Sequence, residues 1–263
     1  MSAGQATFDY SGCNVLIFGG TSGINLGIAQ GFAEAGANIG VVGRNVEKAE
    51  AARQTLRRGS GSAHAYSADV RDMEAVTRAF EAFTRATGPI DVLVSGAAGN
   101  FPAEALAMSS NGFRSVVEID LIGTFHVMRA GYAHLVKPGA SVINISAPQA
   151  EVAMAKQVHV CAAKAGVDMV TKTLAIEWGP AGVRVNSVIP GPIDGTEGMD
   201  RLTPTPESRD AVIQSVPMKR MGEPRDVAGA CLFLGSDAAR YVSGAILAAD
   251  GGWLANGAVL DLG

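Results

Sequence analysis

Short apolar runs alternate with longer amphipathic stretches along the whole chain. The runs are rich in Val and Ile, and the stretches between them repeat apolar positions at helical spacing. The runs predict strands at Val15–Phe18, Asn38–Val42, Ala63–Ser67, Asp91–Val94, Ser141–Ile145, Arg184–Ile189 and Ala245–Ala248. The longer stretches predict helices at about residues 24–35, 46–57, 72–86, 109–135, 157–178 and 224–235.

Buried strands that alternate with helices predict an α/β fold. The expected architecture is a single doubly wound, Rossmann-type parallel sheet with helices on both faces. No seam divides the 263 residues, so residues 1–263 are predicted to form one domain. The least regular segment is 190–217, which holds five prolines and three glycines. A long irregular segment in a compact domain favours a lid over the substrate.

Composition narrows the class of protein. Hydrophobic residues make up 48% of the chain, enough for a large core, and the net charge of −4 argues against a nucleic-acid partner. Cys13, Cys161 and Cys231 are far apart, which favours a reducing compartment without disulfides. Neither they nor the isolated histidines have the spacing of metal ligands.

The chain shows no sign of a membrane or of export. No apolar run approaches the roughly 18–20 residues that span a bilayer. The N-terminus lacks a signal-peptide pattern, and the final residues, Leu-Asp-Leu-Gly, match no address signal. A cytoplasmic location is therefore expected.

A glycine-rich turn follows the first predicted strand. Gly19 and Gly20 end the apolar run, and helical spacing begins at Ile24. Helix N-terminal N–H groups bind anions, and glycines let a pyrophosphate approach the backbone. The turn therefore predicts a dinucleotide-binding βαβ unit. Its predicted cofactor contacts are Gly19, Thr21, Ser22, Gly23 and Ile24.

The end of the second predicted strand predicts which nicotinamide cofactor is bound. An acidic residue there would hold the ribose 2′-hydroxyl of NAD, whereas a basic residue would accept the 2′-phosphate of NADP. This chain has Arg44 there and no carboxylate before Glu47. A guanidinium pairs well with phosphate, so NADP(H) is the predicted cofactor. The alternative is a solvated Arg at a strand end.

Several ordered motifs resemble the short-chain dehydrogenase/reductase family over about residues 10–253. They are the glycine turn, Ala68-Asp69-Val70, Ser95-Gly96-Ala97-Ala98-Gly99, the helix that carries Lys164, and Pro190-Gly191-Pro192. The resemblance implies adenine contacts from Asp69 and Val70 and ribose contacts from Lys164. It also places Gly96, Ala97, Pro190, Gly191 and Ile193 around the nicotinamide side of the cofactor. It further implies a homotetramer, formed through the helices at 109–135 and 157–178.

The chain departs from the usual family motifs at several positions. Val160 stands where the family has its catalytic Tyr, Ala147 where it has Ser, and Asp120 where it has Asn. The Ser-Tyr machinery for carbonyl reduction is thus absent. In the glycine turn Phe18 replaces Thr, and Asn25 replaces the last Gly. The Asn25 amide is able to donate a hydrogen bond there.

One branch of the family shows the same departures. Ala97-Ala98-Gly99-Asn100-Phe101, Glu118-Ile119-Asp120, Gln157-Val158-His159 and Glu177-Trp178-Gly179-Pro180 resemble 2,4-dienoyl-CoA reductases, the peroxisomal type most. This resemblance implies an acyl-CoA substrate. It also implies that Asp120 and Lys164 hold a water that delivers a proton and that Asn100 binds the thioester carbonyl.

Two other functions remain open at this point. One is a carbonyl or imine reductase that uses a water or Asp120 as its acid. The other is a catalytically silent relative that binds nucleotide as a sensor or assembly subunit, which the loss of Ser, Tyr and a turn glycine favours. Arg114, Lys219 and Arg220 are candidates for contacts with the CoA phosphates.

Overall fold

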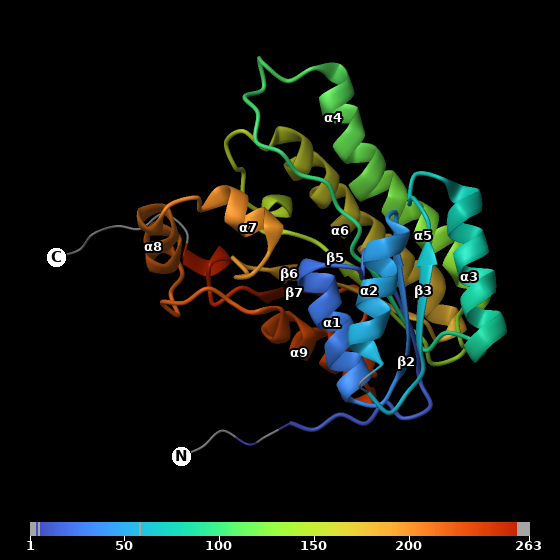
Figure 1. Cartoon of the computed structure of the whole chain (residues 1–263). Helices are drawn as coiled ribbons and strands as arrows, with labels where there is room; N and C mark the ends of the chain where they lie inside the picture. The colour runs from blue at the N-terminus through green and yellow to red at the C-terminus, as the bar shows by residue number, and fades with distance from the viewer. Residues whose placement is uncertain (1–3, 5, 58, 257–263) are drawn as a thin grey trace.

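A computed structural model describes residues 4, 6–57 and 59–256. It contains one sheet of seven parallel strands in the order β3-β2-β1-β4-β5-β6-β7 (Figure 1). The predicted α/β fold with a single parallel sheet is confirmed. The strands are β1 Asn14–Phe18, β2 Asn38–Gly43, β3 Ala63–Ser67, β4 Val92–Ser95, β5 Ser141–Ile145, β6 Arg184–Pro190 and β7 Ile246–Ala249.

Helices cover both faces of the sheet (Figure 1). Val15 and Ile17 of β1 pack into a core with α1 and α9, whereas Leu16 and Phe18 pack with α3 and α5 on the other face. The α-helices are α1 Gly23–Glu34, α2 Val46–Leu56, α3 Met73–Thr87, α4 Ser110–Val117, α5 Gly123–Gly131, α6 Val158–Trp178, α7 Glu197–Leu202, α8 Pro206–Ser215 and α9 Pro224–Gly235.

The strand order places the candidate site. The chain winds outward from β1 to β3 and then crosses back to β4, which pairs with the other edge of β1. In open parallel sheets ligands bind beyond the carboxyl ends of the strands at such a reversal. The glycine turn after β1 and the loop that begins at Gly96 after β4 therefore meet there.

The segment 190–217 is more regular than its composition predicts. It contains α7 and α8, so the expectation of an irregular segment is wrong. Thr196 accepts a hydrogen bond from the Met199 N–H and caps α7. Thr205 caps α8, and Pro206 occupies its first turn. Proline is favoured at that position because the missing N–H has no helical partner anyway. Pro206 thus begins a helix here.

The predicted helix at 109–135 is not a continuous α-helix. A π-helical segment, Glu118–Ile122, separates α4 from α5, and a 3-10 turn follows at Tyr132–His134. The Gly123 N–H donates to the Glu118 carbonyl, five residues back. Such wider turns are rare and often lie at functional sites. Asp120 lies at the centre of this segment.

Within the described ranges no helix is both long and apolar enough to cross a membrane. The final residues Leu-Asp-Leu-Gly, 260–263, lie outside the described part of the chain.

Candidate active site

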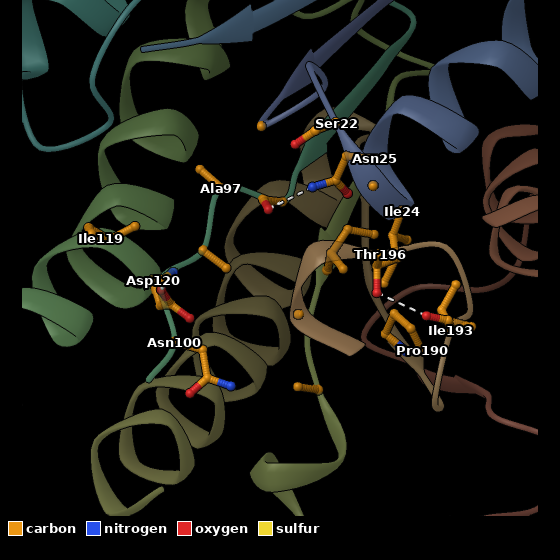
Figure 2. A pocket seen from close by; sticks show the side chains of 18 of the residues that line it. Ser22, Ile24, Asn25, Ala97, Asn100, Ile119, Asp120, Pro190, Ile193 and Thr196 are labelled. Carbon is orange, nitrogen blue, oxygen red and sulfur yellow. Dashed lines mark hydrogen bonds between the residues drawn. The ribbon is translucent and has the colours of Figure 1, made fainter. Parts of the chain in front are cut away.

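A cavity of about 560 Å³ opens at the carboxyl ends of the strands. The segments that follow strands β1 to β6 form its walls, together with residues of α6 and α7. Every residue that the sequence assigned to the site lines this main cavity: Gly19, Thr21, Ser22, Gly23, Ile24, Arg44, Asp69, Val70, Gly96, Ala97, Asn100, Asp120, Lys164, Pro190, Gly191 and Ile193. In Figure 2 Asn100 and Asp120 line one side, and Pro190, Ile193 and Thr196 line the other.

The glycine turn has the conformation that a phosphate site needs. Gly19 and Gly23 have φ of +78° and +55°, in the left-handed region that favours glycine. A Cβ on Gly19 would lie 2.7 Å from the Ala97 backbone nitrogen, so the turn packs directly against the loop after β4. The Ser22 side chain makes no capping hydrogen bond to α1. The helix N-terminus can therefore accept an anion.

Asn25, which replaces the last glycine of the motif, ties the turn to the neighbouring loop. Its Nδ2 donates to the Gly96 carbonyl over 2.7 Å, and the side chain is buried (Figure 2). A Cβ on Gly96 would lie 2.4 Å from the Asn25 Oδ1 atom, so the two residues fit only as a pair. The amide donates as expected, but to the protein backbone.

Opposite charges flank the end of the cavity where the sequence predicts that the adenine binds. Arg44 follows β2, is exposed, and makes no ion pair with any described residue. Asp69 is held by Arg71 over 2.6 Å, and this guanidinium lowers the pKa of Asp69. An unpaired cation at the end of β2 fits a cofactor with a 2′-phosphate.

Asp120 and Lys164 form a buried ion pair at the centre of the site. Asp120 Oδ2 lies 3.4 Å from Lys164 Nζ, with the two side chains only 1% and 6% exposed. Asp120 Oδ1 accepts the Gly99 N–H over 2.7 Å, and Lys164 Nζ donates to the Ile145 carbonyl over 3.0 Å. Burial raises the pKa of Asp120, although Lys164 and the Gly99 N–H oppose the shift.

Three side-chain amides form a cluster beside the ion pair. Gln149 Nε2 donates to Gln157 Oε1 over 2.7 Å, and Asn100 Nδ2 approaches the same oxygen at 3.5 Å. The site prediction did not include Gln157, which is buried and precedes α6. The sequence feature that could have identified Gln157 is its position at the start of the helix that carries Lys164. The cluster restrains the Asn100 amide at the cavity wall.

The cavity wall lacks the tyrosine and the serine of the usual family motif. Val160 and Ala147 line it where the family motif has Tyr and Ser. None of the four tyrosines, all within the described residues, is among the lining side chains. The three basic residues considered for CoA phosphates do not line it either. Arg220 pairs with Asp226 over 2.7 Å, and Arg114 lines a separate cavity.

Comparison with known proteins identifies a family and related enzymes. The family model described as "Enoyl-(Acyl carrier protein) reductase" matches residues 19–254. A peroxisomal 2,4-dienoyl-CoA reductase of Danio rerio, described as (3E)-enoyl-CoA-producing, is 42% identical over 90% of this chain and 80% of its own. A probable (2E)-enoyl-CoA-producing 2,4-dienoyl-CoA reductase of Bacillus subtilis is 38% identical over 91% and 96%.

Solved structures share the fold. A short-chain dehydrogenase of Bacillus anthracis superposes with a TM-score of 0.81 at 38% identity, covering 92% of this chain and 96% of its own. A putative short-chain alcohol dehydrogenase of Sinorhizobium meliloti reaches 0.90 at 30% identity, covering 95% and 99%.

The fold and the cavity thus define a nicotinamide-dependent oxidoreductase with a doubly wound sheet. The chain belongs to the short-chain dehydrogenase/reductase family.

The raised pKa of Asp120 predicts how stability depends on pH. A carboxyl with a pKa higher in the folded than in the unfolded state gives stability that is full below the unfolded pKa. That stability is lost as the pH rises through the folded pKa. We expect the free energy of unfolding of the wild type, minus that of Asp120→Asn, to fall as the pH rises above about 4, the pKa of an unfolded aspartate.

Urea unfolding at several pH values measures this difference. Asp210→Asn, an exposed change on α8, is the matched control and should leave the corresponding difference flat. A difference that rises with pH for Asp120→Asn would contradict the assignment.

Proposed function

We propose that the protein reduces a conjugated 2,4-dienoyl-CoA thioester with NADPH. The observation that carries this proposal is the buried pair of Asp120 and Lys164 in a cavity without a tyrosine. Relatives at about 40% identity named as 2,4-dienoyl-CoA reductases support the substrate class.

The residues around the cavity fit a dinucleotide. The α1 N-terminus and the left-handed turn glycines would hold the pyrophosphate, and Arg44 would hold the 2′-phosphate. Lys164 would contact the ribose. When bound, the reduced nicotinamide supplies a hydride to the far carbon of the conjugated system.

The proton must reach the α carbon of the resulting dienolate. A phenol aimed at an oxygen is not needed for protonation at carbon, and the cavity has none. Asp120 and Lys164 would instead hold a water that gives up this proton, and the Lys164 ammonium would return a proton to the hydroxide. The product would be a 3-enoyl thioester.

The enolate oxygen needs hydrogen-bond donors that are already in place. Asn100 has two amide hydrogens, and only one is directed to Gln157 Oε1. The second would donate to the thioester oxygen. The Gln149–Gln157 hydrogen bond supports this role because it fixes the acceptor that orients Asn100.

The segment 190–217 is proposed as the substrate lid. Thr196, Met199 and Leu202, of α7 and its cap, line the main cavity. The Arg209–Asp194 ion pair ties α8 to the loop before α7. An apolar wall on a small helix suits an acyl chain.

A homotetramer is proposed on the basis of exposed apolar side chains. Phe125 and Ile122 are 47% and 42% exposed at and just before α5, and Met169 and Ile176 are 60% and 79% exposed on α6. Apolar side chains on adjacent helices favour contact with another copy. The cytoplasmic location stays a prediction; the Danio rerio relative described above is named as a peroxisomal enzyme.

The first prediction from the proposed function concerns turnover. The wild type should oxidise NADPH with 2,4-hexadienoyl-CoA, and in deuterated water one deuterium should enter the α carbon. Asp120→Asn should lower kcat at least about 100-fold, the smallest usual contribution of acid–base catalysis. Absorbance at the NADPH band gives the rate, and product NMR locates the deuterium.

Glu118→Gln is the matched control, since Glu118 lies on the same π-helical segment but does not line the cavity. Full turnover in Asp120→Asn would refute the proton relay. Turnover of ketones but not of dienoyl-CoA would favour the carbonyl reductase.

The second prediction concerns cofactor choice. Arg44→Ser should weaken NADPH binding about 10- to 100-fold, which is the value of a charge-assisted hydrogen bond. NADH binding should stay nearly constant because NADH has no 2′-phosphate. Fluorescence titration measures both, and Lys48→Ser, at an exposed position of α2, is the control. An equal loss of affinity for NADPH and NADH would show that Arg44 does not recognise the 2′-phosphate.

The third prediction concerns assembly. Sedimentation velocity should show a tetramer, and Phe125→Asp combined with Met169→Asp should yield smaller species, since a buried charge opposes an apolar interface. Val46→Asp, at an exposed position of α2, is the control. A monomeric wild type would contradict the proposal.

A further inference from the structure

The main cavity extends beyond the part that the cofactor is predicted to fill. Arg44 and Asp69, which follow β2 and β3, line the end where the adenine is predicted to bind. Trp253, which follows β7, lines the same cavity. Because β3 and β7 are the two edge strands of the sheet, Trp253 lines the cavity from the edge opposite the predicted adenine site.

The neighbouring part of the cavity wall is mostly apolar. Met154 lies between β5 and α6, and Met199 and Leu202 belong to α7. In Figure 1 α7 lies on the side of β6 and β7, whereas β3 lies on the other side. An apolar wall favours a hydrocarbon chain, because each methylene removed from water contributes favourable free energy. The acyl chain of the proposed substrate therefore fits between α7 and Trp253.

The indole ring of Trp253 is held in place by α8. Its Nε1 donates to the Oγ atom of Ser215, the last residue of α8, over 3.1 Å. The Asn256 Nδ2 donates to the Ser215 carbonyl over 3.1 Å. The ring is half-buried, and an indole N–H is a donor that needs such a partner when it leaves water. The ring is thus fixed between the cavity and the end of the proposed lid.

The backbone turn before this ring is fixed as well. The two carboxylate oxygens of Asp250 accept the N–H groups of Gly252 and Leu254, over 2.9 and 2.8 Å. Gly251 has a φ of +66°, in the region that favours glycine. A Cβ on Gly251 would lie 2.7 Å from the Cγ1 atom of Val216, which directly follows α8. The turn therefore packs tightly against the end of the lid.

We propose that Trp253 is a specificity-determining residue, which limits the length of the acyl chain that the cavity accepts. This inference rests on the proposed function, because it assumes an acyl thioester whose carbonyl lies at Asn100. From that carbonyl the chain runs along α7 towards the indole ring. A longer chain meets a ring that the turn and Ser215 hold in place, so it gains no further buried surface.

The first test measures binding and needs no turnover. The probes are saturated acyl-CoAs from butanoyl-CoA to dodecanoyl-CoA, with CoA as the reference, in the presence of whichever oxidised nicotinamide cofactor binds more tightly. Calorimetry gives the affinities. In the wild type each added methylene should tighten binding about 3- to 4-fold until the chain reaches Trp253, and further methylenes should add nothing.

In Trp253→Ala this gain should continue to longer chains. The affinity for dodecanoyl-CoA relative to hexanoyl-CoA should then exceed the wild-type ratio at least about 10-fold, which is the value of roughly two buried methylenes. Trp253→Phe keeps a smaller aromatic wall and should give an intermediate ratio. Ser215→Ala removes only the partner of the indole N–H and should shift the ratio in the same direction by less.

Tyr241→Ala is the matched control, because Tyr241 is a fully exposed aromatic residue. It should keep the wild-type dependence on chain length. Thermal unfolding and cofactor affinity show that each variant is folded, and Trp253→Phe decides the test if Trp253→Ala does not fold. The same chain-length dependence in the wild type and the Trp253 variants would overturn the proposal, as would acyl-CoAs that bind the wild type no better than CoA.

Intrinsic fluorescence tests the contact directly. Trp178 and Trp253 are the two tryptophans of the chain, so the emission of Trp178→Phe comes from Trp253 alone. This emission should change with acyl-CoAs long enough to reach the ring, and it should stay constant with CoA or butanoyl-CoA. A constant emission with a tightly bound long-chain acyl-CoA would count against Trp253.

A turnover measurement separates this inference from the proposed function. With 2,4-dienoyl-CoAs of six to twelve carbons, Trp253→Ala should raise the ratio of kcat/KM for the longest to that for the shortest by the factor found in binding. If the binding test succeeds and the wild type turns over no dienoyl-CoA, the proposed function fails and this inference stands. Wild-type turnover with a chain-length preference that Trp253→Ala leaves unchanged would refute the inference alone.

Discussion

The arrangement of the site depends on one buried ion pair. Asp120 and Lys164 lie 3.4 Å apart with almost no exposure, and each buried ion costs several kcal/mol of solvation. Two hydrogen bonds offset part of that cost. The Gly99 N–H donates to Asp120, and the Ile145 carbonyl accepts from Lys164. The pair therefore requires that the loop after β4, the end of β5, the π-helical segment and α6 all hold their places.

The same pair sets the proposed reaction apart from carbonyl reduction. A phenol beside a lysine protonates an oxygen, whereas a carboxylate beside a lysine has no proton aimed at the substrate and would work through water. Val160 and Ala147 line the cavity where the family motif has its hydroxyl groups. Under the proposal, the loss of the phenol and the presence of the carboxylate belong to one change of chemistry.

The sheet could be predicted from sequence because Val- and Ile-rich runs buried on both faces have few alternatives. All seven predicted strands are present, and their ends lie close to the predicted ones. The 190–217 segment was misjudged because Pro206 begins a helix there. The π-helical segment had no signal in the hydrophobic spacing, since one extra residue in a turn hardly changes the pattern.

The candidate site could be located because its residues follow the strands in order. All the predicted side chains reach one cavity, and their individual roles stay predictions. Asn25 and Gln157 depend on contacts distant in sequence: Asn25 bonds to Gly96, and Gln157 accepts from Asn100. The spacing of residues along the chain does not indicate that Asn25 contacts Gly96.

The π-helical segment also constrains how this site can change by insertion or deletion. The Gly123 N–H bonds five residues back, so the segment holds one residue more than an α-helical turn would. Because the wide turn absorbs this extra residue, deleting a single codon between Glu118 and Ile122 would leave a regular helix running from α4 into α5 and would change the direction of the side chains within the segment. The acid at position 120 is therefore tied to that one surplus residue.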